Sequence, residues 1–308
     1  MMLNSPARIK ENVRSKKWDW HGYLFILPVL AVLAFLDFYP LAFGIYYSLT
    51  DFSLAHIFNY KYIGARNYLF ILNGNIPPLA VLVWQTFEWS LGSIILMSSF
   101  GFLLALLMNQ PGLRGTRFYR TIYLFPWAYP AFITVLIWKG LLDYNLGFIN
   151  KFLGIFGIAK IYWFGLPSTS MLSLILVNLW LSFPYYTFVY TASLQSVPRE
   201  LYDSARMDGY GTFGSVRKVA LPLLKRQIAF VTIFGFIFTW NNFYVPFLLT
   251  NGSPGTSTFI LITYTYYEAT NSLPNWAMAS AYAMISVLIM LAVVAVVNRF
   301  TKMMSVIY

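Results

Sequence analysis

The sequence predicts an all-α integral membrane protein with about six transmembrane helices. Of its 308 residues, 59% are hydrophobic and only 10% are charged, whereas a soluble domain usually has about 25% charged residues. A chain so poor in charge cannot bury all of its apolar side chains in a water-soluble core. The apolar residues also fall into long stretches, so we expect lipid to surround much of the chain.

Each predicted span follows from its length. A bilayer core of about 30 Å needs about 20 apolar residues in a helix. Six stretches meet this requirement: 23–48, 90–108, 123–142, 171–194, 228–249 and 276–297. The first is not expected to be a cleavable signal peptide, because it is long, contains Asp37 and Pro40, and lacks a small-residue cleavage site after it. We therefore expect a helical membrane domain over residues 23–298.

The distribution of basic residues predicts the orientation of these spans. Six spans place both termini on the same side of the membrane. If that side is the cytoplasm, the cytoplasmic segments hold 16 of the 21 Lys and Arg residues, and the other side retains Lys61, Arg66, Lys139, Lys151 and Lys160. The positive-inside rule therefore predicts two cytoplasmic tails, 1–22 and 299–308. The net charge of +11 then reflects topology, and we expect no nucleic-acid partner.

Several classes of chemistry are excluded by the residues present. The chain has no cysteine, which rules out disulfides, thiolate nucleophiles and Cys-based metal sites. The spans contain no combination of nucleophile and base and no cluster of metal ligands. No Gly-rich phosphate loop with a following Lys is present, and the Gly-x-Gly-x-x-Gly match at 209–214 lacks a preceding strand. We expect no catalytic residue, metal or cofactor in this chain.

The connection between the fourth and fifth spans, residues 196–222, contains the sequence signals of a short helix followed by a glycine turn. Ser196 as a cap and Pro198 in the first turn predict the start of a short helix. Gly209 and Gly211 would supply the left-handed backbone conformations that end this helix. The composition alone fits an amphipathic helix at the membrane surface or a docking helix for a soluble partner.

The same connection resembles the EAA motif of ABC importer permeases. Asp203-Ser204-Ala205, Gly209 and Val219-Ala220-Leu221-Pro222 stand at the spacing of that motif, with conservative departures at Asp203, Ser204 and Val219. In the family, this coupling helix fits a cleft on the ATPase subunit and transmits its closure to the membrane. The resemblance implies that the ATPase-docking residues are Glu200, Tyr202, Asp203, Ser204, Ala205, Arg206, Met207, Asp208 and Gly209.

The resemblance extends over residues 23–297. Tyr39-Pro40, Phe125-Pro126-Trp127 and Asn251-Gly252-Ser253-Pro254 are similar to segments of the carbohydrate-uptake branch, which includes maltose and glycerol-phosphate permeases. This similarity implies the ABC type I importer permease architecture in its plain six-helix form. It also implies a bacterial inner-membrane location.

Polar and aromatic residues interrupt the fourth and fifth spans. Proteins bind sugars through hydrogen bonds to the hydroxyl groups and through aromatic rings against the apolar faces. The resemblance to maltose-type permeases implies a substrate path along Trp180, Leu181, Ser182, Tyr185, Gly235, Phe238, Thr239 and Asn242. Gly235 and Thr239 depart from the polar residues of that family, so the solute or its position can differ here.

The resemblance also implies the assembly and the mechanism. The chain would pair with a second permease subunit, usually a different chain, in the lipid bilayer. Two ATPase subunits would bind ATP and Mg, and a periplasmic solute-binding protein would deliver the carbohydrate for alternating access. The acidity of the sugar and the subunit that holds the main site stay open.

An ion-coupled secondary carrier is the alternative. It predicts inverted repeats and functional charges within the membrane. Asp37 is the only acidic residue that lies clearly inside a predicted span, and Glu88 lies at an outer edge.

Overall fold

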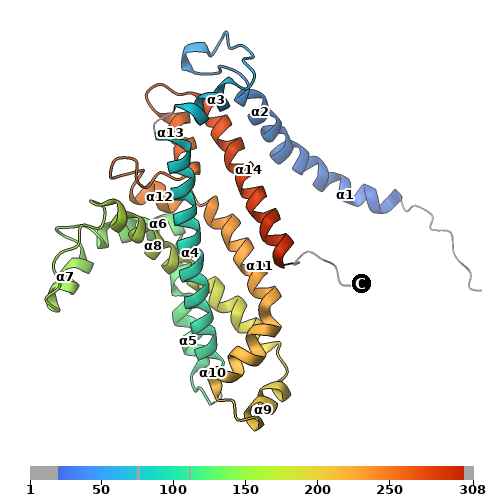
Figure 1. Ribbon diagram of the computed structural model, residues 1–308, viewed down its shortest axis with the longest axis vertical. Helices are drawn as coiled ribbons and strands as arrows, with labels where there is room; N and C mark the ends of the chain where they lie inside the picture. The colour runs from blue at the N-terminus through green and yellow to red at the C-terminus, as the bar shows by residue number, and fades with distance from the viewer. Residues whose placement is uncertain (1–19, 75–76, 111, 302–308) are drawn as a thin grey trace, which may run out of the picture. The chain divides into compact units, whose positions relative to one another are not determined.

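The computed structural model describes residues 20–74, 77–110 and 112–301 (Figure 1). Within these ranges the chain is almost entirely helical, with a single isolated β-bridge between Thr50 and Tyr62. The prediction of an all-α chain is confirmed. Most of the two expected cytoplasmic tails, 1–19 and 302–308, lies outside the described residues.

The chain divides into two compact units, residues 1–44 and 45–308. The first unit contains α1 (Trp20–Leu33), a π-helical turn (Ala34–Phe38) and the beginning of α2 (Tyr39–Ser48). Together they form a hydrophobic helical segment, Tyr23–Ser48, whose most apolar 18-residue window has no buried residue. Asp37 lies in the π-helical turn.

The second unit contains the remaining helices, which are named here by their bounds. They are α3 (Arg66–Asn73), α4 (Leu79–Met108), α5 (Thr116–Leu124), α6 (Ala131–Leu141), α7 (Phe148–Ile155), α8 (Pro167–Gln195), α9 (Arg199–Met207), α10 (Thr212–Ser215), α11 (Leu221–Trp240), α12 (Tyr244–Leu249), α13 (Leu261–Thr270) and α14 (Trp276–Thr301). Short turns at Leu54–His56, Phe125–Ala128 and Val216–Ala220 connect some of them.

Five helical segments of the described chain are long and apolar enough to cross a membrane. They are Tyr23–Ser48, Leu79–Met108, Pro167–Gln195, Thr212–Trp240 and Trp276–Arg299. A sixth candidate is the pair Phe118–Ala128 and Ala131–Leu141, which is bent by 90°. Each of the six predicted spans overlaps one of these, so the predicted number is reached when the bent pair counts as one span.

Three predicted boundaries were wrong. The second span begins at Leu79 rather than at residue 90, because Gln85 and Glu88 interrupt the apolar run without interrupting the helix. The fifth spans Thr212–Trp240 rather than 228–249, because the chain leaves the helix at Asn241.

The third span is not a straight helix. Pro126 and Pro130 lie at the bend between α5 and α6, where proline removes backbone donors and restricts the residue before it.

The centre of the second unit is the contact of α4 with α8 and α11. Gly101 of α4 lies directly against Tyr186 of α8, so that a methyl group at Gly101 would overlap the Tyr186 Cβ. Small residues allow two helices to approach closely in a membrane. The Ser98 and Tyr190 hydroxyl groups are hydrogen-bonded at 2.6 Å across the same contact.

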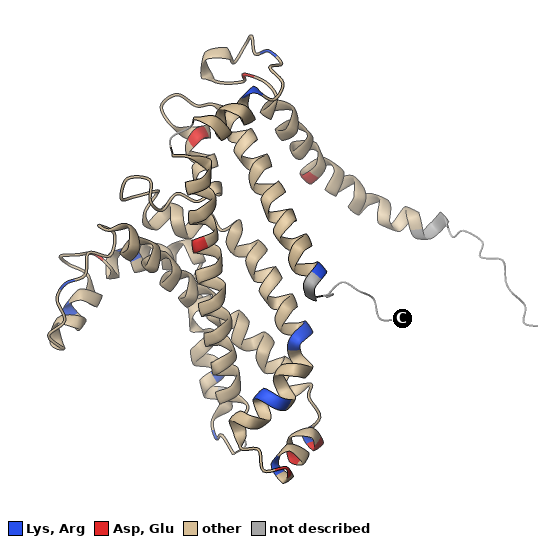
Figure 2. Ribbon diagram, viewed as in Figure 1, with Lys and Arg blue, Asp and Glu red and all other residues tan. Residues whose placement is uncertain are grey.

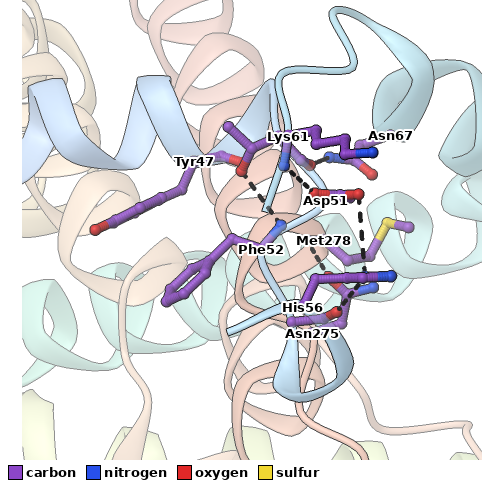
Figure 3. Close-up of polar contacts among 10 residues, drawn as sticks. Tyr47, Asp51, Phe52, His56, Lys61, Asn67, Asn275 and Met278 are labelled. Carbon is purple, nitrogen blue, oxygen red and sulfur yellow. Dashed lines mark hydrogen bonds and ion pairs between the residues drawn. The ribbon is translucent and has the colours of Figure 1, made fainter. Parts of the chain in front are cut away.

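The segment between α2 and α3 is folded onto the beginning of α14 (Figure 3). Asp51 Oδ1 accepts a hydrogen bond from the Lys61 backbone N–H at 2.5 Å, and Asp51 Oδ2 lies 4.0 Å from His56 Nδ1. The Asn67 side-chain amide donates to the Ser48 and Thr50 carbonyl oxygens at 2.9 and 2.7 Å. These bonds give a polar connection a defined structure at the end of the unit that holds α3 and α13.

Candidate functional site

Helix α9 lies at the end of the second unit opposite α3 and α13, next to α10 (Figure 1). Its start differs from the prediction. Helix α8 continues to Gln195, so Ser196 caps the end of α8 and its hydroxyl donates to the Ser193 carbonyl oxygen at 2.7 Å. Pro198 stands just before the first residue of α9, where its missing N–H removes no helical hydrogen bond.

One face of α9 packs against the rest of the chain, and the opposite face is exposed. Ala205 is 5% exposed, and Tyr202 packs against the core near α11. Burial raises the pKa of the Tyr202 phenol above its usual value of 10.0. The predicted docking residues on the exposed side are Glu200, Asp203, Ser204, Arg206, Met207, Asp208 and Gly209.

The exposed side of α9 combines charge with the large apolar side chains of Leu201 and Met207. Acidic and basic residues are interspersed along the ribbon in this region (Figure 2). Arg206 lies 3.5 Å from Asp203, and an exposed pair of this kind stabilises a helix only slightly. Met207 is 84% exposed. A flexible apolar residue within a charged surface is typical of a protein contact.

Gly209 ends α9 in the predicted way. Its φ is +83°, a left-handed conformation that L-residues with a side chain rarely adopt. The Tyr210 N–H donates to the Ala205 carbonyl oxygen at 2.9 Å, and the Gly209 N–H donates to the Arg206 carbonyl oxygen at 3.0 Å. This pair of bonds is a Schellman motif. The prediction for Gly211 was wrong, because its φ is −70°, which any residue can adopt.

The predicted path residues lie on helices α8 and α11, apart from Asn242 in the break after α11, and they differ in exposure. Trp180 and Phe238 are exposed, and Leu181, Ser182, Tyr185 and Asn242 are half-buried. Gly235 and Thr239 are buried. A methyl group at Gly235 would overlap the Tyr186 hydroxyl, and the Thr239 carbonyl oxygen accepts a hydrogen bond from Trp89 Nε1 at 3.0 Å. The structure therefore gives Gly235 and Thr239 contacts within the chain itself.

Asn178 is a polar residue of this region that the sequence reasoning missed. Its Oδ1 accepts a hydrogen bond from Asn242 Nδ2 at 3.2 Å, and its own Nδ2 is buried without a partner among the described residues. The signal was an amide in the apolar run of the fourth span, where an unsatisfied polar group is costly. Together the two amides join α8 to the break that follows α11.

Comparisons with known proteins decide the family. Residues 97–304 match the family described as the binding-protein-dependent transport system inner membrane component. The chain belongs to this family. It is therefore an inner-membrane permease subunit, and its relatives are transporter subunits rather than enzymes.

Two relatives show how far the similarity of this permease extends. The galactooligosaccharides transport system permease protein GanP of Bacillus subtilis is 32% identical over 97% of this chain and 74% of its own length. The maltose/maltodextrin transport system permease protein MalF of Escherichia coli is 37% identical over 74% of this chain and 46% of its own length.

A solved structure shows the fold of the permease. The crystal structure of a bacterial ABC transporter involved in the import of the acidic polysaccharide alginate has a chain that matches with a TM-score of 0.79. The match covers 94% of this chain and 97% of that chain, at 20% sequence identity. The predicted importer permease fold is confirmed.

Proposed function

We propose that this chain is the membrane-spanning permease subunit of an ATP-driven importer that moves a sugar or oligosaccharide by alternating access. The observation that carries the proposal is α9, an exposed helix that the Gly209 turn closes at the position of the EAA motif. GanP and MalF are named for the transport of oligosaccharides, and this supports a carbohydrate as the solute.

The connection of α9 to the membrane helices supports a coupling role. The inner face of α9 contacts α10 and the turn at Val216–Ala220. That turn continues without interruption into α11, so residues Thr212–Trp240 form one helical segment. A displacement of α9 by a partner would therefore pass along α11 to its end at Asn241. This end lies beside the Asn178–Asn242 hydrogen bond.

Each end of the permease would contact a different class of partner. We place both termini and α9 in the cytoplasm, because most Lys and Arg residues then lie on that side. There α9 would dock on one of two ATPase subunits, which bind ATP and Mg²⁺. A periplasmic solute-binding protein would deliver the sugar at the opposite end, and a second permease, a different chain, would complete the path.

The residues proposed for the path have chemistry that suits a sugar. The exposed Trp180 and Phe238 offer ring faces, while Ser182, Tyr185 and Asn242 offer hydrogen-bonding groups. Leu181, Gly235 and Thr239 would shape the path through packing and backbone atoms.

Uptake by the purified assembly in proteoliposomes tests the proposal. The liposomes would contain this chain, its second permease and its ATPase subunits, with the solute-binding protein and a labelled maltodextrin or galactooligosaccharide outside. We expect uptake only when ATP and Mg²⁺ are present in the lumen. Uptake that needs an ion gradient and no ATP would favour the secondary carrier instead.

A further inference from the structure

A groove lies between the first turns of α4, the first turns of α8 and the connection from α12 to α13. Its volume is about 480 Å³, which is within the range of small-molecule sites. The residues that define its chemistry are Trp84, Gln85 and Glu88 of α4, Ser168 and Met171 of α8, and Ser257 of the connection. None of these belongs to the path residues on α8 and α11 discussed above.

The α4 wall combines an aromatic ring with a carboxylate. Trp84 and Glu88 are four residues apart and therefore lie on the same face of the helix, one turn from each other. Trp84 is 68% exposed, and Glu88 is exposed as well. A ring face takes the apolar side of a sugar and a carboxylate accepts hydrogen bonds from adjacent hydroxyl groups.

Gln85 provides a second and independent observation. Its side chain lines the groove although the residue is only 7% exposed, and its Oε1 has no hydrogen-bond partner among the described residues. A buried polar atom without a partner costs free energy. A ligand hydroxyl group bound beside Gln85 in the groove could donate a hydrogen bond to this oxygen.

The charge of the groove indicates what surrounds it and which ligands it can bind. An exposed carboxylate in hydrocarbon is expensive, so Glu88 indicates that the groove faces water. Glu88 is the only charged residue among the described residues that line it. Without a Lys or Arg, the groove would repel a polyanion such as an alginate oligomer and accept a neutral sugar.

We propose that this groove is an additional sugar-binding subsite, selective for neutral oligosaccharides, at the end of the permease where α4 and α8 begin. One turn below Gln85, Trp89 donates a hydrogen bond to the Thr239 carbonyl oxygen near the end of α11. The groove therefore lies about one helical turn of α4 away from the contact with the end of α11, and it could hold a sugar before the sugar enters the path. The proposal rests on the function proposed above.

Trp84→Ala and Glu88→Gln test this subsite in the assembled transporter. We expect each variant to raise the KM for maltohexaose uptake about tenfold, equivalent to about 1.4 kcal/mol, with kcat unchanged. Phe58→Ala is the matched control, because Phe58 is 91% exposed and lies outside the groove. Binding of maltohexaose, measured by saturation-transfer NMR on the transporter in nanodiscs, should weaken in the same two variants and not in the control.

The selectivity is tested with an alginate pentasaccharide as the competing sugar. Glu88→Lys should increase the binding of the alginate pentasaccharide relative to that of maltohexaose, since the substitution reverses the charge of the groove. Unchanged KM and unchanged binding in both groove variants would overturn the subsite while ATP-driven uptake of sugar stood. Loss of the second permease from the purified variants, with sugar binding intact, would also overturn it, because the groove would then be a subunit interface. Binding through Trp84 without any ATP-driven uptake would contradict the proposed function alone.

Discussion

At the residue scale, the chain offers a matched pair of glycines at the two ends of one turn. Gly209 and Gly211 both have open space where a Cβ would stand, with no atom within 4 Å. They differ in backbone conformation, with φ of +83° and −70°. Gly209→Ala should therefore strain the end of α9 by about 1–2 kcal/mol, whereas Gly211→Ala should not.

The measurement for this pair is the number of ATP molecules hydrolysed per sugar imported. We expect Gly209→Ala to raise that number and Gly209→Pro to abolish uptake while hydrolysis continues, because proline fixes φ near −65°. Gly211→Ala should behave as the wild type. Normal transport by Gly209→Pro would contradict the assignment of α9 as the docking helix.

Gly235 is the predicted path residue for which the structure most clearly indicates a packing role. Because a methyl group there would overlap the Tyr186 hydroxyl, Gly235→Ala should lower the thermal stability of the purified chain. Tyr186→Phe removes the overlapping oxygen and should restore most of that loss. If Gly235→Ala instead raised the KM for sugar without any change in stability, Gly235 would contact the solute and the packing explanation would fail.

At the scale of the element, the contact of α4 with α8 depends on small residues. A Cβ at Gly101 would overlap the Tyr186 Cβ and crowd its backbone, whereas a Cβ at Gly92 would meet only the flexible end of Ile175. We expect Gly101→Ala to destabilise the chain by about 1–3 kcal/mol through overpacking and Gly92→Ala to be nearly neutral. Thermal unfolding in detergent measures both, and equal effects would contradict this difference.

Which elements could be predicted from sequence depended on the signal that each one carried. Long apolar runs located the spans, and Gly209 located the end of α9 because its conformation requires glycine. The start of α4 was missed, since Glu88 lies on an exposed face of a helix that extends past the apolar run. The bend between α5 and α6 and the Asn178–Asn242 bond depend on packing between distant segments, which hydropathy does not report.

At the scale of the whole molecule, the orientation is open to direct measurement because the chain has no cysteine. Single cysteines at Phe58, between α2 and α3, and at Gln110, between α4 and α5, would lie at exposed positions. A membrane-impermeant maleimide should label Phe58→Cys in spheroplasts and label Gln110→Cys only after lysis. The reverse pattern would place α9 outside the cell and contradict the proposed docking on ATPase subunits.

The most direct test of the central claim is to purify the chain from its native membrane in a mild detergent and identify every co-purifying protein by mass spectrometry. A permease subunit whose α9 docks on a partner should bring with it an ATPase and a second permease chain. The Gly209→Pro variant should retain both partners, because it is expected to hydrolyse ATP without importing sugar. If the wild-type chain came out alone and moved solute in liposomes without ATP, the account of α9 as a coupling helix would be wrong.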